Sequence, residues 1–145
     1  MSYRLSVLDK SPIGEGETAA TALSRTLRLA QLAEEWGYHR FWIAEHHNTP
    51  QLASPSPELV IAWILGQTQR IRVGSGGVML QHYSPYKVAE NFNLLASLAP
   101  GRVDLGVGKA LAGYRCRLRR YSMDCIRKKK AVLPISFLSL TAGWR

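Results

Sequence analysis

The feature that most constrains the fold is a repeated alternation of short strand-like runs with helical segments. Strand-like runs occupy residues 4–8, 40–45, 71–76 and 102–107, and each is bounded by turn residues. They recur roughly every 32 residues, a spacing that leaves room for a helix between strands. Connections of this kind predict parallel strands joined by right-handed helical crossovers. The pattern by itself fits both a (β/α) barrel and a doubly wound sheet.

The first connecting segment predicts a helix over residues 17–36. Its apolar residues recur at three- and four-residue spacing, and Gly37 is suited to a left-handed C-terminal cap. The residues predicted to share the buried face of this helix are Leu23, Leu27, Ala30 and Ala33.

Two serine–proline pairs predict where the next helices begin. Ser56 can cap a helix that starts at Pro57 and continues to residue 69, because proline is favoured in a first helical turn. Ser84 and Pro85 repeat the arrangement for a third helix, which ends before Pro100. The residues predicted to face the core from the third helix are Val88, Phe92, Leu95 and Ala99.

Positive charge is concentrated in the last part of the chain. The formal net charge is +9, and residues 111–145 hold nine Lys and Arg against one acid, Asp124, so the first 110 residues carry only +1. Both cysteines, Cys116 and Cys125, lie in the same segment. We therefore predict a folded part over residues 1–109 and a divergent basic tail over 110–145, frameshifted or disordered. The tail lacks the interleaved aromatic residues of a stacking platform, so no nucleic-acid partner is expected.

The two ends of the sequence favour a cytoplasmic protein with no membrane partner. No charged segment followed by an apolar core opens the chain. The weakly polar run 131–144 contains Pro134 and is shorter than the roughly 20 apolar residues that a spanning helix needs.

Residues 42–48 form the segment most suggestive of chemistry, because Glu45, His46 and His47 follow the second strand. In a barrel, that end of the strand faces the active site. Side chains alternate along a strand, so His46 shares a face with Trp42, whereas Glu45 and His47 point the other way if the strand continues. An imidazole can act as a general acid or base near neutral pH. The alternative is that both histidines are satisfied by backbone groups; a metal site is not expected because adjacent strand residues diverge.

Glycines mark the ends of the third and fourth strands. Residues 74–78 include Gly76 and Gly77, which would let the backbone approach a planar ligand closely, although glycines also form bulges. Residues 106–109 combine two glycines with Lys109, a side chain suited to a phosphate. Neither a Rossmann fingerprint nor a P-loop is satisfied there.

A loop at the same predicted edge follows the first strand and contains Asp9, Ser11 and Pro12. These residues are weaker candidates for the site, because loop residues of these types more often form turns.

Taken together, the motifs resemble those of the bacterial luciferase-like flavin monooxygenases over residues 1 to about 109. The matching segments, in order, are 44–48 (AEHHN), 73–80 (VGSGGVML), 84–85 (SP), 89–90 (AE) and 100–109 (PGRVDLGVGK).

This resemblance implies a TIM-barrel, (β/α)8, fold of the α/β class, and an enzyme that uses reduced FMN and O2 to oxidise a small organic substrate. It also implies that His46 is the active-site histidine and that Lys109 stands where the family has an arginine near the flavin phosphate. Gly76 and Gly77 match the place of a non-prolyl cis peptide beside the flavin ring. A flavin reductase and a homo-oligomeric state are further expectations.

The sequence departs from the family after Lys109. A TIM barrel typically needs about 250 residues, so this chain supplies about four β/α units with open sheet edges and a bare apolar face. The abrupt change suggests a frameshift or premature stop, and the chain is expected to turn over slowly or not at all. Two alternatives remain at this point: a non-catalytic half-barrel module that assembles with itself or another chain, and a basic binding protein acting through residues 115–130.

Overall fold

Each strand-like run of the sequence forms a strand, and helices connect the first four strands. The computed structural model describes residues 3–109 and 137–139. The elements, in chain order, are β1 (Ser6–Asp9), α1 (Ala19–Glu35), β2 (Arg40–Ile43), α2 (Pro57–Leu65), β3 (Arg72–Met79), the 3-10 turn η1 (Leu80–His82), α3 (Pro85–Leu98), β4 (Val103–Gly108) and β5 (Phe137–Ser139).

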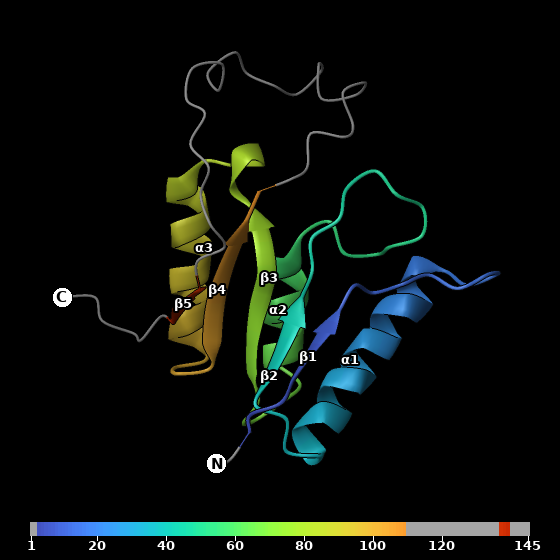
Figure 1. The fold of residues 1–145 in the computed structure, drawn as a ribbon, viewed down its shortest axis with the longest axis horizontal. Coiled ribbons are helices and arrows are strands. Elements are labelled where there is room, and N and C mark those ends of the chain that lie inside the picture. Colours follow the sequence, from blue (N-terminus) through green and yellow to red (C-terminus); the bar gives the residue numbers. More distant parts are fainter. Residues whose placement is uncertain (1–2, 110–136, 140–145) are drawn as a thin grey trace.

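The strands form one sheet in the order β1-β2-β3-β4-β5, and the first four are parallel (Figure 1). Each new strand therefore lies beside the one that precedes it in the chain. A doubly wound sheet instead reverses its strand order at a switch point, whereas a barrel adds strands in sequence. The order confirms the barrel type of α/β architecture and removes the doubly wound alternative.

The helices cover one face of the sheet and bury the core there (Figure 1). Odd-numbered strand residues such as Phe41, Ile43 and Val73 are fully buried beneath them. Ile64 of α2 and Phe92 of α3 complete this layer. Among the described helices, none is long and apolar enough to cross a bilayer.

The predicted helix starts at Pro57 and Pro85 are confirmed, but α2 ends at Leu65 and not at residue 69, and the predicted serine caps are wrong. Gly37 adopts a φ of 77° directly after α1, and α2 and α3 begin at their prolines. Neither Ser56 nor Ser84 makes a side-chain cap hydrogen bond. In α1 it is Thr18 that caps, because its hydroxyl accepts a hydrogen bond from the backbone N–H of Thr21 at 3.2 Å.

The strand bounds differ from the prediction, most at β2, which ends at Ile43 before Glu45, and at β3. β3 continues past the glycines to Met79, and its register against β4 shifts between Ser75 and Val78. β5 lies antiparallel to β4, within the tail for which the sequence predicted no element. The other basic-tail features, including Cys116, Cys125 and the block 127–130, lie outside the described residues.

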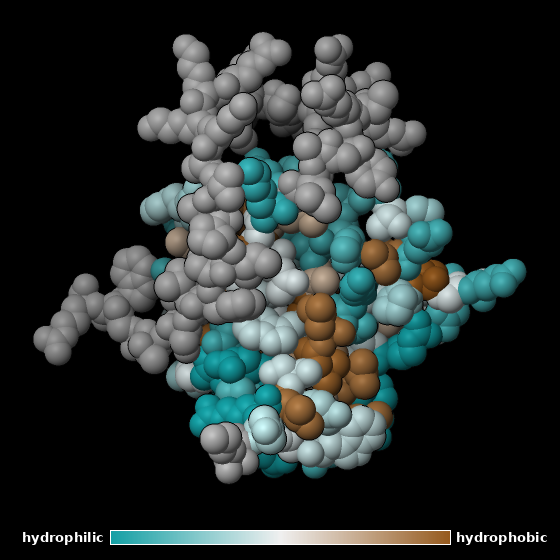
Figure 2. Space-filling view, in the orientation of Figure 1, coloured by the Kyte–Doolittle hydropathy of each residue, from teal (hydrophilic) through white to brown (hydrophobic). Residues whose placement is uncertain are grey.

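The opposite face of the sheet is not covered by any of the described helices. Leu8 remains 55% exposed there, and Figure 2 shows a hydrophobic patch on this face. The same face carries Asp104, which is almost fully buried between two arginines: Arg40 Nε donates to Asp104 Oδ2 at 2.9 Å and Arg72 to Oδ1 at 2.6 Å. We call this surface the inner face.

Candidate active site

The predicted site residues lie at one edge of the sheet, where the parallel strands end. His46 follows β2, Gly76 and Gly77 lie in the second half of β3, and Lys109 directly follows β4. Because β2, β3 and β4 are neighbours, segments separated by about 30 residues in sequence meet at their carboxyl ends (Figure 1). The structure thus places these four predicted residues on the same edge.

Glycine removes side chains from the inner face along β3 and β4. A Cβ at Gly76 would lie 3.2 Å from Leu8 Cδ1 and from Trp42 Cβ, so Gly76 faces inward. Strand alternation puts Gly106 and Gly108 on the same face as Asp104. A Cβ at Gly108 would meet nothing within 4 Å. At Gly108 this edge therefore offers open backbone that a flat ligand could approach.

Gly77 has a different environment from Gly76. A Cβ at Gly77 would lie 2.9 Å from the carbonyl oxygen of Gly106, so the close approach of β4 already requires glycine there. The peptide bond between Gly76 and Gly77 is cis, as the resemblance implied.

His46 is partly buried and its imidazole favours the neutral form. Its backbone N–H donates to the carbonyl of Ser54 at 3.1 Å. Burial lowers the pKa of His46 from its ordinary value, and the charges of Lys10 and His47 lower it further, whereas Glu45 acts in the opposite direction. The net shift leaves a neutral ring that can accept or relay a proton near neutral pH.

A second polar cluster lies on the other side of the same strand end, and the sequence did not predict it. Glu45 is 2% exposed, and its carboxylate contacts His47, the Tyr83 hydroxyl and the Met79 backbone N–H. The ring of His82 meets that of His47 edge-on at 5.4 Å. Burial, followed by the bond to Glu45, raises the pKa of Tyr83 far above its ordinary range. Glu45 and Tyr83 are 38 residues apart, so no local spacing links them.

A small pocket of about 280 Å³ adjoins this cluster between β3, α2 and α3. Tyr83 and His82 line it, together with Val78 and Phe92. It lies beneath the helix layer and not on the inner face, so it is separate from the glycine-lined surface.

The loop after β1 is held by its own contacts, which favours its interpretation as a turn. Ser11 is fully buried at a φ of 50°. The Thr26 hydroxyl lies 2.5 Å from Asp9 Oδ2 and 3.0 Å from Ser11 Oγ. The carbonyl of Pro12 accepts from Arg25 at 2.5 Å. These contacts fasten the loop to α1.

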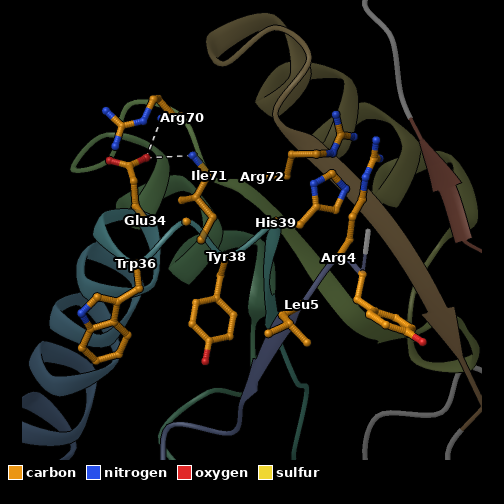
Figure 3. A pocket seen from close by; sticks show the side chains of 11 residues that line it. Arg4, Leu5, Glu34, Trp36, Tyr38, His39, Arg70, Ile71 and Arg72 are labelled. Carbon is orange, nitrogen blue, oxygen red and sulfur yellow. Dashed lines mark hydrogen bonds between the residues drawn. The ribbon is translucent and has the colours of Figure 1, made fainter. Parts of the chain in front are cut away.

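The larger pocket, of about 760 Å³, lies at the opposite end of the sheet (Figure 3). It is bordered by Leu5 before β1, His39 before β2, and Arg70 before β3. Its wall includes Glu34, whose carboxylate is occupied by backbone N–H groups of the loop before β3. In a barrel, the face at the N-terminal ends of the strands contributes to stability. We therefore place the candidate active site at the C-terminal ends of the strands. Among the described residues, no group of three His, Cys, Asp or Glu could hold a metal ion.

The comparisons with known proteins agree on one family. The family model described as luciferase-like monooxygenase matches residues 3–124. N-acetyl-S-alkylcysteine monooxygenase of Bacillus subtilis is 62% identical over 112 residues, which is 77% of this chain and 34% of that protein. The chain thus spans about a third of the length of the curated relatives it matches.

Solved structures give the same result. The crystal structure of apo-MsnO8 matches with a TM-score of 0.76 and 48% identity, over 83% of this chain and 36% of that one. The oxygenating constituent of 3,6-diketocamphane monooxygenase of Pseudomonas putida, solved with FMN, matches with a TM-score of 0.71 and 25% identity, over 76% of this chain and 30% of that one.

Proposed function

The chain belongs to the luciferase-like monooxygenase family, and on that premise we propose that it binds reduced FMN and supports the oxidation of a small organic substrate by O2. In such a reaction one oxygen atom enters the substrate and the other leaves as water, and reduced FMN supplies the two electrons and becomes oxidised. Because the chain is about a third as long as these relatives, the activity of the whole protein is part of the proposal.

The observation that carries this proposal is the open backbone beside His46 and Lys109. Gly108 leaves room on the inner face for the flat ring system of a flavin, and one relative was solved with FMN. The residues present therefore fit the cofactor. Flavin would supply the activation of O2.

The side chains at this edge have distinct tasks in the proposal. Lys109 is exposed at the end of β4, where its ammonium group would pair with the flavin phosphate. His46, with its lowered pKa, would hold or accept a proton at one of its ring nitrogens while the substrate is oxidised. Gly77 keeps β3 and β4 close together beneath this surface.

The first substrate class to test is a thioether. The relative that is 62% identical over 112 residues is named for N-acetyl-S-alkylcysteine, so we propose that sulfur oxidation of a similar small molecule is the reaction. We also propose that a separate flavin reductase delivers the reduced FMN, and that the protein acts in the cytoplasm.

The decisive experiment is an anaerobic titration of the purified chain with reduced FMN, followed by absorbance and fluorescence. We expect a dissociation constant on the order of 1–10 μM. Lys109→Ala removes a charge-assisted contact and should weaken binding about tenfold. Gly108→Ala places a methyl group where the protein has free space, so it should weaken FMN binding without lowering the unfolding temperature.

The matched control is Lys87→Ala, which removes a lysine on α3 that pairs with Glu90 outside the proposed site. It should bind FMN as the unaltered chain does. Absence of FMN binding in a folded sample, or equal binding by all variants, would rule out this flavin site.

A second candidate function, a non-catalytic module that assembles with a second copy, is favoured by the exposure of Leu8 on the inner face. It predicts self-association of the chain that does not depend on flavin.

A further inference from the structure

Glu45 is a buried carboxylate with three polar partners and no role in the flavin site described above. Its side chain has no exposed surface. Oε2 accepts from the backbone N–H of Met79 at 2.9 Å, and Oε1 accepts from the Tyr83 hydroxyl at 2.8 Å. His47 Nε2 lies 2.5 Å from the same Oε1. Burying an ionised carboxylate costs free energy unless hydrogen-bond donors satisfy it. The three contacts together provide these donors for Glu45.

The partners determine where the imidazole proton of His47 lies. The Met79 N–H can only donate, and Tyr83 keeps its proton because its pKa is strongly raised. An ionised carboxylate only accepts, so His47 must also supply a hydrogen to Oε1. The Tyr83 hydroxyl oxygen, 3.4 Å from Nε2, is compatible with a hydrogen on that nitrogen. The neutral ring then carries its hydrogen on Nε2 and a free lone pair on Nδ1.

The same carboxylate joins the ends of two strands. Glu45 lies two residues after β2, and Met79 is the last residue of β3, two residues after Gly77. Neighbouring residues in an extended segment point to opposite faces. Fixing Glu45 under the sheet therefore directs His46 toward the inner face and holds the segment that follows the glycines.

We propose that Glu45 is the positioning residue of this edge: it holds His47 as the Nε2–H tautomer, which leaves Nδ1 as a proton acceptor on the side of the strand end opposite to His46. A catalytic use of His47 Nδ1 rests on the proposed function, whereas the assignment of the Nε2–H tautomer does not. The arrangement has the logic of a hydrolase triad, in which a buried carboxylate fixes the tautomer of a histidine.

The variant Glu45→Gln distinguishes control of the His47 tautomer by Glu45 from a merely structural role of Glu45. A glutamine has one acceptor oxygen, which the Met79 N–H would occupy, and its NH2 group would then face His47. His47 Nε2 would have to accept a hydrogen bond, and the ring hydrogen would move to Nδ1. Charge-assisted hydrogen bonds of this type shift such equilibria roughly tenfold or more. The inversion of the tautomer is a result that mere loss of packing would not produce.

The test is ¹⁵N NMR of the histidine rings in the full chain at a pH of about 8.5, above the ordinary histidine pKa. The His47 signals are assigned from a His47→Gln sample, because the chain has four histidines. We expect at least a roughly tenfold excess of Nε2–H over Nδ1–H in the unaltered chain, and inversion of this ratio in Glu45→Gln. Tyr83→Phe should keep the Nε2–H form, because the contact between Glu45 and His47 remains.

The control is Glu90→Gln, which changes an exposed carboxylate on α3 and should leave the His47 spectrum unchanged. An Nδ1–H tautomer in the unaltered chain overturns the proposal, even if Glu45→Gln does not fold. So does an unchanged tautomer in folded Glu45→Gln. Titration of the same samples with reduced FMN tests the flavin site separately, so a failure of FMN binding leaves the result for Glu45 and His47 intact.

Discussion

His46 and Glu45 are adjacent in the sequence, yet their surroundings differ because they face opposite sides of the sheet. Glu45 is enclosed by hydrogen-bond donors, whereas His46 lies nearer to positive charges and is only partly buried. The sequence could indicate this divergence through strand alternation. It could not indicate Tyr83 and Met79, because these partners come from the end of β3 and the turn after it.

The charge state of His46 gives a prediction at the residue scale. Burial and Lys10 lower its pKa, so we expect an NMR titration midpoint below 6.5. Lys10→Ala removes one positive neighbour and should raise the midpoint, while Lys87→Ala should not. Because the pKa is lower in the folded state, this group's contribution to stability is present above the unfolded value and is lost as the pH falls through the lowered pKa. A His46 titration midpoint above 6.5 in the unaltered chain would contradict the lowered pKa of His46.

The side chain of Glu34 connects the C-terminal end of α1 to the segment that leads into β3. The Glu34 carboxylate accepts from the backbone N–H groups of Gln69, Arg70 and Ile71, at distances from 2.5 to 3.1 Å. This contact lies in the last turn of α1 and precedes the entry to β3 (Figure 3). Burial alone would raise the pKa of Glu34, but these three donors lower it below its ordinary value. The element boundary therefore depends on a contact between distant segments.

The corresponding prediction is that Glu34→Gln lowers the free energy of unfolding by about 1–2 kcal/mol, because the neutral amide accepts less strongly and has one acceptor oxygen. Denaturant unfolding monitored by circular dichroism measures the change. Glu35→Gln is the matched control, since Glu35 is exposed and lies 3.6 Å from Arg28. The pKa of Glu34 is lowered in the folded state, so its stabilisation should be present above pH 4.5 and fade as the pH falls through the lowered pKa. Equal stability of the two variants at neutral pH would refute this role.

Over the whole molecule, the two faces of the sheet are unequal. The helices bury one face, and the inner face keeps the apolar side chain of Leu8 on β1 exposed within a hydrophobic patch (Figure 2). Exposed apolar patches of this kind often mark interaction surfaces. Asp104 and its two arginines stabilise the lower part of the inner face without covering Leu8.

We therefore expect concentration-dependent association of the chain, measured by sedimentation velocity. Leu8→Lys should weaken the association about tenfold, because it replaces an apolar contact with a charge. Leu94→Lys changes an exposed leucine on α3, on the helical side, and should have no such effect. A chain that stays monomeric at all concentrations would exclude the self-assembling module.

The sequence by itself determined the alternation of strands and helices and the shared edge at which the candidate site residues lie. These follow from local periodicity, from proline and glycine at element ends, and from motifs such as those around His46 and Lys109. The prolines that open α2 and α3 and the left-handed Gly37 illustrate this, because each acts through its own backbone preference.

Tertiary structure alone decided the strand order, the partners of Glu45, the anchoring by Glu34 and the antiparallel pairing of β5. It also separated Gly76, which packs against Leu8 and Trp42, from Gly77, which packs against β4. The physical reason is the same in each case. Periodicity reports which way a side chain points within its own element, whereas these features depend on which distant segment lies opposite it, and that is fixed only when the strands are assembled.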